Sequence, residues 1–496
     1  MYYQSTRRPD LRFSPSEAIL QGLAPDGGLF IFDHLPELDV SEVLSLSPME
    51  QSARILEAFF PDLTGIPALV REAYEGKFDT PDLVPTVEAG PYHFLELFHG
   101  PTCAFKDIAL CLLPHLMRAA SVNREDAPTL HILTATSGDT GKAALSGFAD
   151  VPGTKITVFY PDGGVSALQR LQMVTQQGNN VSVYGIRGNF DDAQTGVKAL
   201  FTDKELEDEL AAKHIRLSSA NSINIGRLIP QVMYYFKAYS DLLRAGTVRM
   251  GDKIDFSVPT GNFGDILAGY LAAALGLPVG KLLIAANINH VLTDFVETGV
   301  YDRRRELYLT VAPSMDILVS SNLERLLYLL SGAETSPKAA AAATAGYMRD
   351  LKETGRYEIP EDVHSKLTRY FWSTYADDFD AKETIRSYYQ QYGYLMDPHT
   401  AIGCYTAEKY RQTCPEDDLP IVILSTASCY KFPATVLEAL GNTVPEDPFE
   451  QLSLLQTITN ISVPAPILAL QDLPERHTGV ISREEMKSVI QKEGEM

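Results

Sequence analysis

The 496-residue chain has only five cysteines, and no two of them form a CxxC pair. Because their number is odd and their spacing wide, we do not expect a disulfide framework, and a reducing compartment fits better. The ten histidines show no HExxH or similar ligand spacing. The sequence therefore gives no indication of a metal site.

Long apolar runs are also missing. The opening residues, MYYQSTRRPD, lack the apolar run of a secretion signal. The most apolar stretch, residues 266–279, is interrupted by Gly269, Gly276 and Pro278. It is also shorter than the roughly 20 apolar residues that span a bilayer. We therefore expect a cytoplasmic protein with no membrane partner.

Positive charge is scarce as well: Lys and Arg number 42 against 64 Asp and Glu, which gives a net charge of -22. Such a surface repels nucleic acid and anionic lipid at long range, so neither is an expected partner. A phosphorylated ligand would be repelled too. Its binding would require a locally positive or amide-rich pocket.

The length exceeds what one core usually organises, and an apolar content of 45% is typical of folded proteins. We predict an N-terminal segment over residues 1–90 and a small α/β domain over 91–190. A large α/β domain follows over 191–496, with a helical insertion at about 330–390.

After residue 90, β-rich runs alternate with helical periodicity, which is typical of parallel β-α-β units packed in layers. The fold class we predict is therefore α/β with mostly parallel sheets. The predicted strands are 131–135, 155–160, 181–186, 254–258, 281–286 and 420–424. The predicted helices include 227–243 and 266–275, with solvated helices over 339–345 and 361–389 in the insertion.

Three of these strands end in small, polar loops, where open parallel sheets bind their ligands. The first loop, TATSGDTG (134–141), leads into a helix start, which suits a carboxylate or phosphate, although an ordinary capped turn is the alternative. It is not a nucleotide-binding P-loop, because Thr136 and Ala143 stand where that motif needs Gly and Ser or Thr.

The second and third loops are PTGNFGD (259–265) and STASCYKFP (425–433). Two glycines in the second loop let backbone amides surround a phosphate, although the loop does not match the GxGxxG dinucleotide pattern. Hydroxyls in the third loop could hydrogen-bond a polar ring atom or, equally, cap a helix.

Lys106 is the candidate reactive amine. It lies in HGPTCAFKD (99–107), at the start of a helix with apolar residues at helical spacing. Burial and the helix dipole would both lower the proton affinity of this amine, as imine formation requires. The alternative is a lysine that extends to solvent.

These motifs, in this order, resemble the threonine synthase family, which consists of pyridoxal-phosphate enzymes of fold type II. The likeness spans nearly the whole chain and is greatest to the longer, bacterial and fungal type. Further matching strings are PDGGLF near the N-terminus, SANSINIGRLIPQ (219–231), APSMDILVSSNLERLL (312–327) and DPHTAIG (397–403). The resemblance implies two layered α/β domains, the small one carrying Lys106 and the SGDTG loop.

The resemblance also implies a lyase that makes threonine from O-phospho-L-homoserine and water with pyridoxal 5'-phosphate. Lys106 would hold the cofactor as a Schiff base, Asp139 would lie near its ring oxygen and Thr426 would face its ring nitrogen. Backbone amides would bind the cofactor phosphate at Gly261, Asn262, Phe263 and Gly264. The implied substrate-binding residues are Thr136, Ser137 and Thr140, with Ser166, Gln169, Asn221, Asn224 and Arg227 at the phosphate end.

Two positions depart from the family pattern: His290 follows Asn289 where an acid is common, and Cys429 replaces a usual proline. Both leave Lys106 and the glycine loop intact. Three alternatives to threonine formation stay open: a phospholyase that releases 2-oxobutyrate and ammonia, a threonine or serine dehydratase, and a non-catalytic binding protein. The chain is expected to be a monomer or a homodimer.

Overall fold

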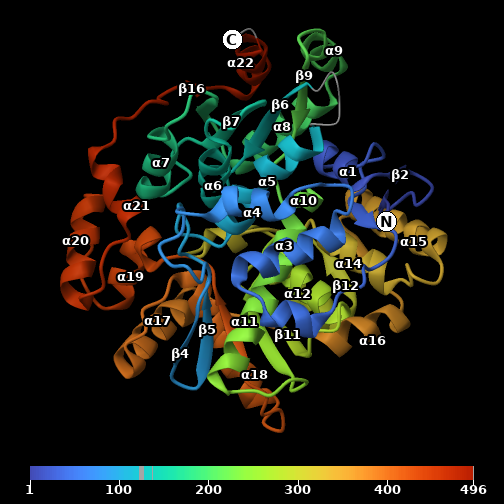
Figure 1. Cartoon of the computed structure of the whole chain (residues 1–496). Coiled ribbons are helices and arrows are strands. Elements are labelled where there is room, and N and C mark those ends of the chain that lie inside the picture. The colour runs from blue at the N-terminus through green and yellow to red at the C-terminus, as the bar shows by residue number, and fades with distance from the viewer. Residues whose placement is uncertain (122–127, 137, 495–496) are drawn as a thin grey trace.

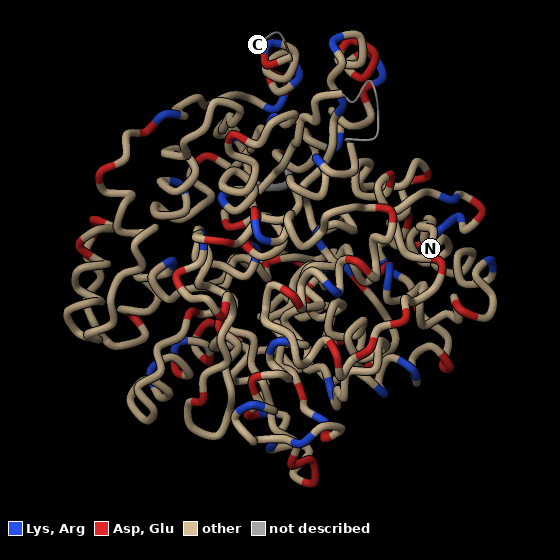
Figure 2. Tube along the Cα trace, viewed as in Figure 1, with Lys and Arg blue, Asp and Glu red and all other residues tan. Residues whose placement is uncertain are grey.

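The structure is a computed structural model that describes residues 1–121, 128–136 and 138–494. Two sheets dominate it, one in the upper and one in the lower half of Figure 1, each flanked by helices. Acidic and basic residues are distributed along the whole trace (Figure 2). In the part of the chain that the structure describes, no helix has the length and apolarity that crossing a membrane requires.

The smaller sheet has five parallel strands in the order β16-β8-β7-β6-β9. Its central strands are almost continuously buried, as expected for a parallel sheet covered on both faces. The strands are β6 (Thr129–Ala135), β7 (Thr154–Pro161), β8 (Val181–Ile186), β9 (Ile215–Ser218) and β16 (Val480–Ile481). Its helices are α6 (Asp139–Phe148), α7 (Ala167–Val174), α8 (Phe190–Thr202) and α9 (Lys204–Ala212).

The larger sheet has six strands in the order β14-β11-β10-β15-β5-β4, all parallel except the edge strand β4. They are β4 (Thr86–Ala89), β5 (Tyr92–Glu96), β10 (Ile254–Pro259), β11 (Val279–Ala286), β14 (Phe371–Tyr375) and β15 (Ile421–Ser425). The associated helices are α5 (Lys106–Ser121), α11 (Val232–Ala245), α12 (Gly264–Ala274), α13 (Val291–Thr298), α17 (Asp378–Tyr392), α18 (Pro398–Thr413) and α19 (Pro433–Ala439). The six predicted strands and the predicted α/β class are confirmed.

The N-terminal segment, drawn in blue in Figure 1, packs on α5 and α11. It forms an antiparallel sheet from β1 (Tyr3–Ser5), β2 (Arg12–Phe13) and β3 (Phe30–Phe32). Its helices are α1 (Pro15–Gln21), α2 (Val40–Ser45), α3 (Pro48–Phe59) and α4 (Ile66–Tyr74). The buried guanidinium of Arg325 donates to the Phe30 carbonyl, which joins this segment to α14 (Leu323–Leu330).

The predicted boundaries at 90 and 190 do not coincide with the division between the sheets. β4 and β5 lie on either side of residue 90 yet pair in the larger sheet, whereas β9 and β16 lie beyond residue 190 and pair in the smaller one. The C-terminal chain reaches the smaller sheet through β16 and α22 (Met486–Glu493), shown in red (Figure 1). Sequence order alone therefore does not separate the two sheets.

Two predicted helices also need correction. The helix over 361–389 is interrupted by β14 between α16 (Glu361–Tyr370) and α17, because the aromatic run FWSTY pairs with β11. The insertion at 330–390 is thus partly a sheet strand, with α15 (Pro337–Glu353) as its main helix. The helix over 227–243 is broken at Pro230, which lacks an N–H, into α10 (Ile225–Leu228), a 3-10 turn and α11.

Candidate active site

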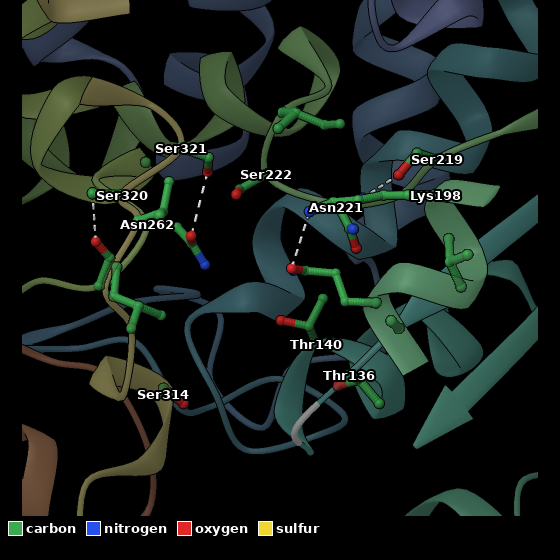
Figure 3. A pocket seen from close by; sticks show the side chains of 18 of the residues that line it. Thr136, Thr140, Lys198, Ser219, Asn221, Ser222, Asn262, Ser314, Ser320 and Ser321 are labelled. Atoms are coloured by element: carbon green, nitrogen blue, oxygen red, sulfur yellow. Dashed lines mark hydrogen bonds between the residues drawn. The ribbon is translucent and has the colours of Figure 1, made fainter. Parts of the chain in front are cut away.

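A cavity of about 2350 Å³ is lined by residues that follow the carboxyl ends of β6, β7, β10 and β15. Figure 3 shows polar side chains of the two halves facing each other across it, with Asn262 and Ser314 opposite Thr140 and Asn221. The predicted residues that line it are Lys106, Thr136, Asp139, Thr140, Ser166, Gln169, Asn221, Arg227, Gly261, Asn262, Phe263, Gly264 and Thr426.

Lys106 is the first residue of α5 and is 8% exposed, which confirms its predicted place in the first turn of a buried helix. Burial lowers the pKa of Lys106 to about 8, and the positive charges of Lys431 and Arg227 add to this effect. Its Nζ lies 3.8 Å from Asp139 Oδ2 and 4.7 Å from the centre of the Phe105 ring. A neutral amine is therefore accessible near neutral pH.

Asp139, at the start of α6, is a buried carboxylate with several partners. Its Oδ1 lies 2.9 Å from Lys431 Nζ and accepts from Gln169 Nε2 at 3.1 Å. Burial alone would raise the pKa of Asp139, but the charges of Lys431 and Lys106 lower it below its ordinary value. The carboxylate is thus ionised between two buried lysines.

Two carbonyls of the glycine loop already accept hydrogen bonds within the protein. Ser320 Oγ donates to the Gly261 carbonyl at 2.7 Å, and the Asn322 backbone and side chain both donate to the Asn262 carbonyl at 3.0 Å. Within the described residues, no acceptor is found for the backbone N–H groups of 261–264. Phe263 adopts φ 61°, a left-handed conformation, at the N-cap of α12. Four free amides at a helix start form an anion-binding cup.

Thr426 follows β15 and is joined to the lysine loop. Its carbonyl accepts from Phe105 N at 2.9 Å, and its N–H donates to Thr400 Oγ1 at 3.2 Å. Its hydroxyl makes no hydrogen bond with the part of the chain described and is available to a ligand. His399, also at the cavity, has its Nδ1 2.6 Å from Asp397 Oδ2 and its Nε2 accepting from Ser314 N at 3.2 Å.

The predicted substrate-binding residues on the smaller sheet differ in their availability. The Thr136 hydroxyl accepts from the N–H groups of Gly138 and Gly141, at 3.0 and 2.9 Å, so it organises its own loop. Ser166 caps α7 in a capping box with Gln169, whose side-chain amide also holds Asp139. Thr140 has no such internal partner among the described residues and lines the cavity. Ser137 lies outside the described residues.

Arg227 is a buried cation at the cavity, 3% exposed. Its Nη1 donates to the Ala220 carbonyl at 2.8 Å, while its Nε has no partner and no carboxylate pairs with it in the described residues. Burial lowers the pKa of Arg227 to about 10. An unpaired, buried guanidinium facing a cavity is a site for an anion, because a bound anion would remove much of its desolvation cost.

The prediction for Asn224 needs correction. Asn224 is fully buried and does not line the cavity. Its Nδ2 donates to the carbonyls of Ile19 and Ser219, and its Oδ1 accepts from Gly226 N at 2.9 Å. The side-chain amide therefore caps α10 and ties it to α1 and to the Ser219 carbonyl.

The two departures from the family pattern lie outside the cavity lining. His290 stacks on Tyr375 at 4.3 Å, with its Nδ1 2.9 Å from Asp294 Oδ1. Cys429 is buried, and burial raises the pKa of its thiol to about 12.

Sequence reasoning missed two residues of the site, Lys431 and His399. Both lie in motifs that had been singled out, STASCYKFP and DPHTAIG. Lys431 stands among apolar residues shortly after a buried strand, just before the Phe-Pro at the start of α19. This position is a signal in the sequence, because a lysine that is buried there requires an acidic partner.

Comparison with known families agrees with this geometry. The sequence model of "Pyridoxal-phosphate dependent enzyme" matches residues 88–345, "Threonine synthase N terminus" matches 2–74, and "Threonine synthase, C-terminal" matches 400–493. The fold and the site thus define a pyridoxal-phosphate-dependent enzyme of fold type II.

Similar proteins narrow this class. Threonine synthase from Pseudomonas aeruginosa is 37% identical over 96% of this chain and 98% of its own length. The crystal structure of pyridoxal-phosphate-bound threonine synthase from Brucella melitensis has a TM-score of 0.87 at 35% identity, with both chains covered fully. Human threonine synthase-like 1 is 38% identical over 89% of this chain, which spans 60% of that longer protein. The chain belongs to the threonine synthase family.

The residues present fit pyridoxal phosphate. The unpartnered amides of 261–264 suit its phosphate. A side chain at Gly261 would place Cβ 2.6 Å from the Ser314 carbonyl, so this close packing requires glycine. Lys106 supplies an amine and Thr426 a hydroxyl to the same cavity. The individual roles of these residues stay predictions.

Proposed function

We propose that the chain converts O-phospho-L-homoserine and water into L-threonine and phosphate, as a pyridoxal-phosphate-dependent lyase. The observation that carries this proposal is the unpaired, buried guanidinium of Arg227 in the cavity of Lys106. A phosphate ester carries more negative charge than the α-carboxylate common to all amino acids, so a charged site beside the glycine cup suits a phosphorylated substrate. Membership of the threonine synthase family supports the same substrate.

The glycine-loop amides would hold the cofactor phosphate, Thr426 would face its ring nitrogen and Lys106 would bind it covalently. Asp139 would lie near the ring oxygen. When bound, pyridoxal phosphate supplies an electron sink for negative charge that develops at the substrate's Cα.

Lys106 would act as the base once the substrate amine has taken its place. A pKa of about 8 leaves about a tenth of the amine neutral at pH 7, which suits repeated proton transfer. It would remove the Cα proton and then a Cβ proton, so that phosphate can leave from Cγ. It would afterwards return a proton to Cγ, which becomes a methyl group, and finally one to Cα.

Arg227 would bind the phosphate ester, with Asn221 and Thr140, which line the same cavity, as neutral partners. Its charge stabilises the phosphate as the Cγ–O bond breaks, because negative charge grows on the leaving oxygen. Water then adds its hydroxyl at Cβ. Thr140 and Asn221 have side chains that can orient this water or the substrate carboxylate.

Product analysis tests the proposal. The purified chain with pyridoxal phosphate and O-phospho-L-homoserine should yield threonine and phosphate in equal amounts by proton and phosphorus NMR. Phosphate with 2-oxobutyrate and ammonia would identify the phospholyase instead. No phosphate release would refute both activities. The Lys106→Ala variant is the control and should lose nearly all turnover.

The compartment and the oligomeric state are proposed from the composition of the chain. The acidic composition and the lack of CxxC pairs support a cytoplasmic enzyme, acting as a monomer or homodimer on a small-molecule substrate. Size-exclusion chromatography with light scattering distinguishes the two oligomeric states.

A further inference from the structure

Lys431 is a second buried lysine at the active site, only 1% exposed. It belongs to a 3-10 turn (Cys429–Lys431) after β15. Its Nζ lies 2.9 Å from Asp139 Oδ1 and donates to the Thr102 carbonyl at 2.9 Å. One ammonium group therefore joins all three loops that bear on Lys106: its own, the SGDTG loop and the HGPTC loop.

The two lysines share one carboxylate unequally. Lys431 makes a direct ion pair with Asp139, whereas Lys106 Nζ is 3.8 Å from the other carboxylate oxygen, beyond hydrogen-bond range. Gln169 also donates to the oxygen that Lys431 binds. Asp139 is thus held by Lys431 and Gln169, and among the described residues Lys106 has no hydrogen-bonded acid.

We propose that Lys431 is a positioning residue: by holding Asp139 in an ion pair, it keeps the Lys106 amine free to react. The inference deepens the proposed function, because it assigns a device that prepares the amine of that same site. It concerns the protein before any cofactor or substrate binds.

Thr102 links Lys431 to the start of α5 as well. The Thr102 N–H and hydroxyl both donate to the carboxylate of Asp107, the residue after Lys106, at 2.8 and 2.5 Å. Lys431 binds the carbonyl of the same threonine. The Lys431 ammonium group therefore contacts both Asp139 and the loop that precedes α5, the helix that begins at Lys106.

The neighbouring charges shift the pKa of Lys106 in the direction that this role requires. After burial, Asp139 is the main influence on the Lys106 pKa and raises it, whereas Lys431 lowers it. Without Lys431, Asp139 would have Lys106 as its nearest cation and would hold the proton on that amine. In a protein without Lys431, Lys106 would therefore be a weaker nucleophile at neutral pH.

The experiment measures Lys106 itself in the cofactor-free protein. Labelling with 1-fluoro-2,4-dinitrobenzene, which reacts with neutral amines, is followed from pH 6 to 10 by peptide mass spectrometry. In the wild-type protein, Lys106 labelling should have its midpoint near the pKa of about 8. Lys431→Met should raise this midpoint by about one pH unit or more, which makes labelling at pH 7 about tenfold slower.

Two further variants sharpen the comparison. Lys431→Arg keeps a cation beside Asp139 and should restore most of the wild-type profile. Lys142→Met is the matched control: burial lowers the pKa of Lys142 to about 8 too, but its Nζ donates to Gln176 Oε1 at 2.6 Å and does not touch Asp139. This control should leave the Lys106 midpoint unchanged.

An unchanged Lys106 midpoint in folded Lys431→Met would overturn the inference. If that variant does not fold, the wild-type protein decides: Lys431 must label far more slowly than Lys106, and equal or faster labelling refutes the proposed pairing. Because no substrate is used, these results are independent of product analysis. A chain that made no threonine but showed the predicted labelling would refute only the proposed function.

Discussion

Replacing Arg227 should leave the stability of the ligand-free protein nearly unchanged and weaken ligand binding. Lowering the Arg227 pKa from its ordinary 12.5 to about 10 corresponds to about 3 kcal/mol spent on keeping the buried guanidinium charged. Arg227→Met removes this cost but also loses the hydrogen bond to the Ala220 carbonyl, worth roughly 1–3 kcal/mol. The ligand-free variant should therefore be about as stable as the wild-type protein.

Binding of the phosphorylated substrate should instead weaken sharply. Loss of a charge-assisted contact to phosphate costs about 2 kcal/mol or more, which is about a thirtyfold rise in Kd. Urea unfolding measures the stability, and calorimetric titration with O-phospho-L-homoserine measures the affinity, with kcat/KM as a second readout.

Arg325 provides the matched control for this experiment. It is also a fully buried arginine without an ion pair in the described residues, but it donates to the Phe30 and Ile223 carbonyls and to Asn322 Oδ1 and does not line the cavity. Arg325→Met loses three hydrogen bonds where Arg227→Met loses one, so it should destabilise the fold more than Arg227→Met does. If Arg227→Met behaved like Arg325→Met, with unchanged substrate affinity, Arg227 would be a structural cation and the reasoning would fail.

Three further predictions concern the cofactor side of the cavity. Gly261→Ala places Cβ 2.6 Å from the Ser314 carbonyl, so spectrophotometric titration should show at least about tenfold weaker binding of pyridoxal phosphate; unchanged affinity would contradict the anion cup. Burial raises the pKa of Asp265 to about 7, so the wild-type protein loses stability as the pH rises from about 4 to 7. Asp265→Asn does not ionise, so its free energy of unfolding in urea should exceed that of the wild-type protein by an amount that grows to about 4 kcal/mol across this pH range. A difference between the two proteins that does not change with pH would contradict this prediction. Thr426→Val keeps both backbone hydrogen bonds and should fold normally, yet turnover should fall about tenfold through loss of one hydroxyl contact; wild-type turnover would remove the hydroxyl from the mechanism.

Much of the fold could be predicted because the buried parallel strands carry their signal locally. Runs such as 254–258 and 420–424 are apolar and bounded by loops, so their type is determined by their own residues. The strand β14 was missed because the short run FWSTY lies between two helical patterns, and pairing with β11 decided its conformation. Strand partners such as β16 and β8 depend on tertiary contacts that no local pattern encodes.

The site divides in the same way. Lys106 and the glycine loop could be identified because their local sequence sets both a helix start and a backbone cup. The pairing of Lys431 with Asp139 could not, because it depends on how two sheets face each other. Asn224 illustrates a third limit: an amide side chain that caps a helix has the same sequence signature as one that binds a ligand.

The most direct test of the central claim is to find which lysine holds the cofactor. The chain loaded with pyridoxal phosphate is reduced with borohydride, which fixes the cofactor to the amine that carries it, and the modified peptide is sequenced by mass spectrometry. The pyridoxyl group is expected on Lys106. Its appearance on Lys431 or Lys142, or its absence from every lysine, would contradict the assignment of this site.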